Sequence, residues 1–248
     1  MKVTIITVVF NAEKYLKDCI DSVLGQDYEN IEYVVIDGGS TDATLSIIES
    51  YSSKIHYFIS EPDKGMYDAL NKGIKIATGD VIGILNADDM LASDDVISAI
   101  VREFKEKQPD GVYGNLNYID LGFSKKIIRK WVSKQFVKRD ILLGWMPAHP
   151  TLYLKKELFS HYGNYSLDFG TAADYELMIR FLYLHQVNAK FLDKLFVNMR
   201  VGGMSNSSLK QRYLALINDY KAVKKNSLPY PLLTVFFKKI TKLKQFLF

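Results

Sequence analysis

The sequence predicts an α/β fold, with a mainly parallel sheet covered by helices on both faces and a C-terminal helical tail. Two observations lead to this fold class. Four β-branched, apolar runs alternate with segments of helical periodicity over residues 1–107, which is the pattern of repeated βα units. Residues 206–248 then change to a basic and apolar composition, which distinguishes the tail from the sheet-forming part.

The four predicted strands are short apolar runs that end at polar residues: 3–10, 31–36, 55–59 and 81–85. The helices that follow them have apolar residues at spacings of three and four: 11–24, 43–48, 66–77 and 93–107. The next part is less regular, with an expected strand at 111–118, a strand or a loop at 125–131, an apolar segment at 152–158 and a helix at 173–185. In the tail we expect a helix at 209–225, followed by a break at Pro229-Tyr230-Pro231.

The composition is that of a globular protein from a reducing compartment. Of the 248 residues, 48% are apolar, which is enough for one large domain with an appendage. Cys19 is the only cysteine, so no intrachain disulfide is possible. No apolar run reaches the roughly 20 residues that a membrane-spanning helix needs, and the first residues lack the features of a signal peptide. We therefore expect a cytoplasmic protein.

The net charge of +4 is unevenly distributed along the chain. Residues 221–248 contain seven lysines and no acidic residue, whereas residues 1–220 contain 25 basic and 28 acidic residues. This distribution argues against a general nucleic-acid-binding protein and indicates an anionic partner for the tail. Apolar residues interleave with these lysines, which suits a segment lying on an anionic membrane surface. A C-terminal helix packed on the domain, with its lysines in water, explains the pattern equally well.

Polar clusters follow the predicted strands, at the sheet edge where parallel α/β folds bind ligands. Asp88 and Asp89 come directly after the fourth strand. Adjacent carboxylates at such a place suit a hard divalent cation such as Mg²⁺, which readily joins protein carboxylates to substrate phosphates. The alternative is that one of the two aspartates caps the following segment.

Three further polar residues have both a functional and a structural explanation. Asp37 follows the second strand and precedes two glycines, which suits contact with a base or ribose but also suits an ordinary turn before a helix. Asp174 begins the predicted helix at 173–185, either as a general base or as a favourable partner of the helix dipole. His149 lies between prolines, where it either lines the site or packs within a loop.

Several segments together resemble family 2 of the inverting glycosyltransferases, which have the GT-A fold. In order they are Thr4-Ile5-Ile6-Thr7-Val8-Val9-Phe10-Asn11, Asp37-Gly38-Gly39-Ser40-Thr41-Asp42, the segment from Glu61 to Gly73, Leu85-Asn86-Ala87-Asp88-Asp89, His149-Pro150-Thr151 and Ala173-Asp174-Tyr175-Glu176. The resemblance covers about residues 2–205. It implies a GT-A-like, Rossmann-type domain over 1–205, with a nucleotide-binding half at about 1–110 and an acceptor half at about 111–205, and it leaves 206–248 as the tail.

The resemblance also implies roles for individual residues. The residues expected to contact the nucleotide-sugar donor are Thr7, Phe10, Asn11, Asp37, Lys64, Asp88 and His149. Within that set, Phe10 would lie against the base and Lys64 near the diphosphate, where Lys72 is also close. Asp88 and Asp89 would bind a divalent metal, Mg²⁺ or Mn²⁺, while Asn86 replaces the first aspartate of the family's Asp-x-Asp motif. Asp174 matches the catalytic base.

The implied reaction is the transfer of one sugar, with inversion, from a nucleoside-diphosphate sugar to a hydroxyl of a saccharide or lipid-linked saccharide in cell-surface polysaccharide biosynthesis. If the tail binds a membrane, the reaction takes place at the inner face of the cytoplasmic membrane. Two alternatives have distinct signatures. A sugar-phosphate nucleotidyltransferase would show a glycine-rich, basic loop after the first strand, where this chain has no such loop and no G-x-G-x-x-G. A non-catalytic nucleotide-sugar-binding subunit would lack the metal pair or the base.

Overall fold

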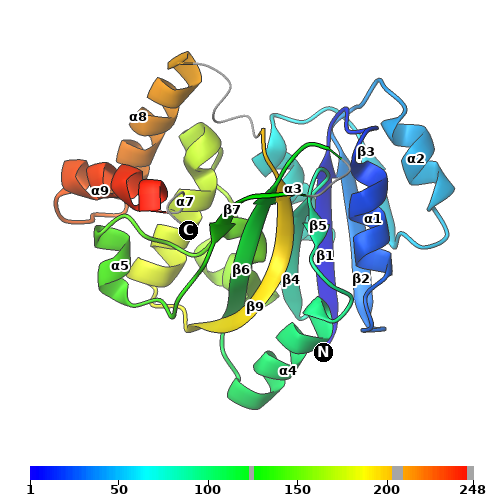
Figure 1. Cartoon of the computed structure of the whole chain (residues 1–248), viewed down its shortest axis with the longest axis horizontal. Coiled ribbons are helices and arrows are strands. Elements are labelled where there is room, and N and C mark those ends of the chain that lie inside the picture. The colour runs from blue at the N-terminus through cyan, green and yellow to red at the C-terminus, as the bar shows by residue number, and fades with distance from the viewer. Residues whose placement is uncertain (123–125, 203–208, 245–248) are drawn as a thin grey trace.

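The computed structural model describes residues 1–122, 126–202 and 209–244 (Figure 1). Its nine-stranded sheet has the order β3-β2-β1-β4-β8-β6-β9-β5, with β7 paired to β6. The strands are β1 (Val3–Val9), β2 (Ile31–Asp37), β3 (Tyr57–Ser60), β4 (Val81–Asn86), β5 (Met90–Leu91), β6 (Gly111–Ile119), β7 (Ile127–Trp131), β8 (Tyr153–Lys155) and β9 (Ala189–Arg200).

The helices alternate with the strands in the first half and gather after β8 in the second. The α-helices are α1 (Leu16–Leu24), α2 (Thr44–Ser50), α3 (Met66–Ile76), α4 (Val96–Lys107), α5 (Lys138–Leu142), α6 (Lys156–Tyr162), α7 (Ala173–Met178), α8 (Leu209–Lys225) and α9 (Pro231–Lys244). Two 3-10 segments, η1 (His149–Thr151) and η2 (Leu167–Ala172), and a π-helical turn, η3 (Ile179–Leu184), complete the chain.

The first half confirms the predicted parallel sheet with helices on both faces. Strand β1 pairs in parallel with β2 and β4, and β2 pairs in parallel with β3. Successive side chains of a strand point to opposite faces, and Ile6 packs against Gly73 of α3 while Thr7 contacts Cys19 of α1. Helices α1 and α3 therefore cover opposite faces of the sheet. A side chain at Gly73 would collide with Ile6, so α3 depends on this glycine for its close approach.

The second half is a mixed sheet that differs from the sequence prediction in several elements. Residues 125–131, left open between strand and loop, contain β7, and residues 152–158 divide into β8 and the start of α6. Strand β9, which the sequence analysis did not predict, pairs in parallel with β6. The two-residue strand β5 pairs antiparallel with β9, so the turn after β4 is attached to the second half of the chain.

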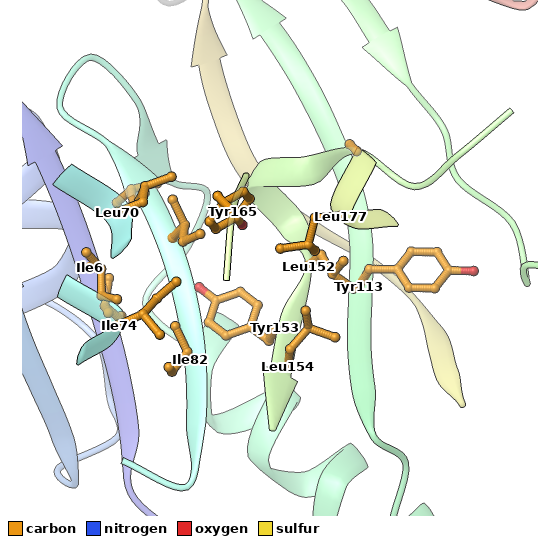
Figure 2. Close-up of a cluster of buried hydrophobic side chains, with 14 of the residues drawn as sticks. Ile6, Leu70, Ile74, Ile82, Tyr113, Leu152, Tyr153, Leu154, Tyr165 and Leu177 are labelled. Carbon is orange, nitrogen blue, oxygen red and sulfur yellow. The ribbon is translucent and has the colours of Figure 1, made fainter. Parts of the chain in front are cut away.

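The two halves pack through one hydrophobic core. Figure 2 shows Ile6, Ile74 and Ile82 on one side of this cluster and Leu154 and Tyr153 on the other. The Tyr153 ring lies against Gly83 of β4, where a Cβ atom would come within 2.1 Å of the ring. The absence of a side chain at Gly83 therefore allows β8 to pack directly beside the donor half.

The C-terminal helices pack on the acceptor half (Figure 1). Helix α8 contacts η2 and α7, and α9 contacts α5 and α8. The predicted boundary between 205 and 206 lies outside the described residues, as do residues 203–205 of the glycine-containing loop that follows Arg200. Within the described part of the chain, no helix has the length and apolarity required to cross a bilayer.

Candidate functional site

Asp37 lies at the end of β2 and holds the loop after it. Its carboxylate is fully buried and accepts hydrogen bonds from the backbone N–H groups of Gly39 and Ser40 and from the hydroxyls of Ser40 and Ser60. Four donors from the protein use most of the acceptor capacity of one carboxylate. The geometry thus gives Asp37 a structural task in shaping this loop, and its predicted contact with the nucleotide stays a prediction.

The three predicted residues of β1 and its loop lie in different environments. Thr7 is buried and its hydroxyl accepts a hydrogen bond from Tyr33, so it faces the interior under α1. Asn11 has a left-handed backbone, φ 47°, and its side-chain oxygen accepts from Thr41, which joins the loops after β1 and β2. Phe10 is 64% exposed at the open edge, where its ring is accessible to a ligand. Thr7 is therefore inaccessible, whereas Phe10 and Asn11 are both exposed.

The two lysines near the predicted diphosphate position differ in their partners. Lys72 is engaged, because its ammonium lies 2.8 Å from a Glu61 carboxylate oxygen and donates to the Pro62 carbonyl. Lys64 is exposed, and its ammonium forms no ion pair with any described residue. Of the two, Lys64 has the cation that is available to an anionic ligand.

Asp88 and Asp89 are adjacent but have different surroundings. Asp89 is fully buried; one of its oxygens accepts from the Arg200 backbone N–H at 3.1 Å and the other from the Asn86 amide at 3.0 Å. Burial and the negative charge of Asp88 raise the pKa of Asp89 well above its usual value. The Asp88 carboxylate is half-buried and, among the described residues, accepts no hydrogen bond from another residue. Asp88 therefore has more free acceptor capacity than Asp89, each of whose oxygens already accepts one hydrogen bond.

Arg200, which the sequence analysis left without a role, supports the turn that carries this pair. The residue is 3% exposed, and its guanidinium donates to the Asp88 carbonyl at 2.7 Å and to the Asp18 carboxylate. It also lies 4.5 Å from the centre of the Tyr15 ring. One side chain at the end of β9 thus joins α1 to the turn between β4 and β5. The sequence analysis could not place Arg200 beside Asp88, because this contact depends on β9, which was not predicted.

Asp174 lies at the start of α7 in a cluster of aromatic side chains. One carboxylate oxygen accepts from the Tyr175 backbone N–H at 2.7 Å. Burial raises the pKa of Tyr67 well above its usual value, and the charge of Asp174 and a hydrogen bond to its carboxylate raise it further. The Tyr67 hydroxyl donates to the Thr171 carbonyl at 3.5 Å, just before the start of α7. This tyrosine comes from α3 in the donor half, and nothing in its helical position marked it as a site residue.

His149 and Tyr165 complete the cluster around Asp174. The His149 Nε2 atom lies 2.7 Å from the Tyr165 hydroxyl, and the two rings meet edge to face. Burial lowers the pKa of His149, and the charge of Asp174 acts in the opposite direction. Tyr165 is in turn held by Asn71 of α3, whose side chain pairs with the Tyr165 backbone at 2.8 and 3.0 Å. His149 is consequently a neutral hydrogen-bonding group fixed across the two halves.

Tyr118 connects the two groups of carboxylates. Burial raises the pKa of Tyr118 and the charge of Arg129 lowers it, while the charges of both Asp89 and Asp174 raise it. This residue of β6 is therefore affected both by a charge in the turn after β4 and by a charge at the start of α7. The charges of Asp89 and Asp174 thus act on the same tyrosine, and the charge of Asp174 also acts on His149.

The residues at this site do not form a closed metal-binding cage. Within the described residues, no group of three or more histidine, cysteine, aspartate or glutamate side chains is arranged to hold a metal ion. Mg²⁺ and similar ions are often held by one or two carboxylates together with substrate phosphates. The free carboxylate of Asp88 fits that second arrangement, in which a diphosphate ligand supplies the remaining oxygens.

Comparison with known proteins agrees with this fold. The model of the family "Glycosyl transferase family 2" matches residues 4–167. A PGL/p-HBAD biosynthesis glycosyltransferase of Mycobacterium tuberculosis is 28% identical over 228 residues, covering 85% of this chain and 82% of the relative. An uncharacterized glycosyltransferase of the same species is 33% identical over 183 residues, covering 72% of this chain and 68% of the relative.

Two solved structures share the fold. The Staphylococcus aureus protein TarS (residues 1–349) in complex with UDP-GlcNAc is similar with a TM-score of 0.72 and 19% identity, covering 94% of this chain and 69% of that one. The mannosyltransferase PcManGT of Pyrobaculum calidifontis, in complex with GDP-Man and Mn²⁺, has a TM-score of 0.66 and 18% identity, covering 96% of this chain and 68% of that one.

The mixed α/β sheet with its carboxylates at the meeting point of two halves defines a GT-A glycosyltransferase. The chain belongs to glycosyl transferase family 2, and it is an enzyme of that family.

Proposed function

We propose that this enzyme transfers one sugar, with inversion, from a nucleoside-diphosphate sugar to a hydroxyl of a saccharide or lipid-linked saccharide in cell-surface polysaccharide biosynthesis. The observation that carries the proposal is the Asp88 carboxylate after β4, which accepts no hydrogen bond from another described residue, in a chain of family 2. The nucleotide sugars bound to TarS and PcManGT support the class of donor.

The donor lies along the edge formed by the loops after β1, β2 and β4. Phe10 offers an exposed ring for the base, and Lys64 offers an unpaired ammonium for the diphosphate. Asp88 would hold a divalent metal, which would supply positive charge to the diphosphate. Asp89 is the residue that fixes the Asp88 turn against Arg200, because both of its oxygens already accept hydrogen bonds within the protein.

Asp174 is the general base of the reaction. Its carboxylate takes the proton of the acceptor hydroxyl as the acceptor oxygen forms a bond to the anomeric carbon. The bond from that carbon to the diphosphate oxygen breaks, and the electron pair leaves with the nucleoside diphosphate, close to Lys64. Tyr67 supports the start of α7 through the Thr171 carbonyl, and the imidazole of His149, whose pKa is lowered by burial, lines the acceptor side.

The acceptor half faces the saccharide. A lipid-linked acceptor agrees with the basic, apolar tail, because such an acceptor lies at the cytoplasmic surface of a membrane. The reaction then takes place in the cytoplasm, with the enzyme peripheral to that surface.

The test is donor binding and sugar transfer measured separately over a panel of UDP-, GDP- and dTDP-sugars with Mg²⁺ or Mn²⁺. We expect Asp174→Asn to bind donor as the wild type does and to lose transfer by about a hundredfold or more, the usual contribution of a general base. The matched control is Asp168→Asn, an exposed aspartate six residues earlier, which should retain transfer. Normal transfer by Asp174→Asn would remove Asp174 from the mechanism.

A further inference from the structure

Helix α9 buries two polar residues beside the apolar Val235 and leaves a line of apolar residues exposed on its other side. Thr234 is 1% exposed and Lys238 is 6% exposed, although neither is an apolar residue. On the other side, Leu232 is 74% exposed and Phe236 is 59% exposed. A helix on the surface of a soluble domain normally has the opposite arrangement, with its apolar stripe toward the core.

The inward side of α9 is held by specific contacts. The Lys238 ammonium donates to the Asp219 carboxylate at 2.6 Å and lies 3.4 Å from the centre of the Tyr175 ring. The Thr241 hydroxyl donates to the Gly144 carbonyl at 3.1 Å. Gly144 has no room for a side chain, because a Cβ atom would lie 2.1 Å from the Lys238 backbone nitrogen. These contacts fix the rotation of the helix, so the exposure of its apolar side is a consequence of its docking.

The outward side of α9 forms a continuous apolar face. Leu232, Phe236 and Ile240 follow one another at intervals of four residues, which places them in line on one side of a helix. Leu233 and Tyr230 extend this face and are 53% and 75% exposed. All five side chains are exposed, from Ile240 at 37% to Tyr230 at 75%.

The charges around the apolar face select an anionic occupant. Lys221, Lys224, Lys225 and Lys239 are exposed on α8 and α9, and residues 221–248 contain no aspartate or glutamate. A second copy of the chain would bring an equally positive surface to this face, which disfavours self-association. An apolar face bordered by lysines is the pattern of a helix that lies in the interface of an anionic membrane.

We propose that the face formed by Leu232, Leu233, Phe236 and Ile240 inserts between the lipids of an anionic membrane, with Lys239 and the lysines of α8 on the headgroups. Lys238 touches Tyr175, the residue after Asp174, so a membrane-bound α9 holds the acceptor side of the site at the membrane surface. This inference rests on the proposed function in one respect: the orientation on the membrane serves to meet a lipid-linked acceptor.

The test is co-flotation of the full chain with vesicles of phosphatidylcholine alone or with phosphatidylglycerol added. Deleting α9 is unsuitable, since it also removes Lys238 from Asp219. The variant is therefore Leu232→Gln with Phe236→Gln, and the matched control is Tyr57→Gln with Phe58→Gln, two exposed aromatic residues on the edge strand β3. Thermal unfolding of each variant confirms that it is folded.

We expect the wild type and the β3 control to float with phosphatidylglycerol vesicles and the α9 variant to lose at least about tenfold in membrane partitioning. Lys224→Gln and Lys239→Gln should each weaken partitioning by about fivefold. Partitioning of the folded α9 variant equal to that of the wild type would overturn the proposal. So would a wild-type dimer that the α9 variant converts to a monomer, because the face would then belong to a second copy. Donor binding measured in the same samples distinguishes the two proposals: intact flotation without donor binding refutes the function alone, and donor binding without flotation refutes the membrane face alone.

Discussion

The different surroundings of Asp88 and Asp89 make a pair of neighbouring substitutions informative. Asp89→Ala leaves the Arg200 backbone N–H and the Asn86 amide inside the protein without their acceptor. Each such group costs about 1–3 kcal/mol. The loss is reduced because the variant also removes a buried carboxylate that Asp88 repels. We expect the free energy of unfolding to fall by about 2–4 kcal/mol.

Asp88→Ala should have the opposite profile. Asp88 is half-buried and accepts no hydrogen bond from another described residue, and its charge is unfavourable for Asp89. The free energy of unfolding should therefore change by less than about 0.5 kcal/mol or increase slightly. The metal-dependent part of UDP or GDP binding should disappear, because the free carboxylate at this turn is gone.

Urea unfolding followed by circular dichroism measures the first effect, and calorimetric titration of UDP and GDP with and without Mn²⁺ measures the second. Asp94→Ala, at an exposed aspartate nearby, is the control for the loss of one negative charge. The reasoning is refuted if Asp88→Ala loses as much stability as Asp89→Ala. It is equally refuted if Asp89→Ala stays as stable as the wild type and loses metal-dependent binding, since Asp89 would then be the metal ligand.

Three more predictions follow from buried polar groups. Lys238→Met should lower the free energy of unfolding in urea by about 3–5 kcal/mol, because it leaves Asp219 buried without its partner. The control Lys239→Met, at an exposed lysine, should change this free energy by less than about 0.5 kcal/mol. Equal losses in the two variants would contradict the prediction. Burial alone would raise the pKa of Glu32, but hydrogen bonds from its neighbours lower it from 4.5 to about 2. A lowered folded-state pKa stabilises the fold at pH values above the unfolded pKa of 4.5, and this contribution is lost as the pH falls through the folded pKa. Glu32→Gln should therefore remove about 3 kcal/mol of pH dependence from the free energy of unfolding between these two pKa values. An unchanged slope would refute this prediction. Burial raises the pKa of Cys19 to about 12, so its thiol should react with Ellman's reagent only after unfolding, and rapid reaction of the folded enzyme would show that the thiol is accessible.

The first half of the fold could be predicted because its elements are defined by local pattern. Strands β1 to β4 are apolar runs, and each of the helices between them has one apolar face, so residue spacing alone locates them. Strand β9 lacks such a signal, since its burial does not alternate along the twelve residues from Ala189 to Arg200. It becomes a strand by pairing with β6, and β5 has only two residues. Contacts between distant segments decide both elements, and a local pattern does not contain them.

The tail shows the same limit in its side chains. The interleaved lysines and apolar residues of α9 suited both a packed helix and a membrane-surface segment. The structure shows a packed helix whose lysine at 238 points inward, because Asp219 and Tyr175 provide an anion and an aromatic face there. Both partners come from other elements, so helical periodicity in α9 could not identify its inner side. Packing and membrane contact are then compatible, since they use opposite sides of one helix.

The same reasoning explains which part of the site the sequence could predict. Residue type and position after a strand brought Asp37, Asp88, Asp89 and Asp174 forward as candidates, and the fold places them at strand ends or at a helix start that faces them. What the sequence does not contain is the number of protein donors that each carboxylate already has. Asp37 accepts four hydrogen bonds and Asp89 accepts two from inside the protein, whereas Asp88 accepts none from another described residue. A carboxylate binds a metal or takes a proton more readily when the fold leaves its oxygens with fewer donors, so the remaining acceptor capacity favours Asp88 over Asp89 as the metal ligand.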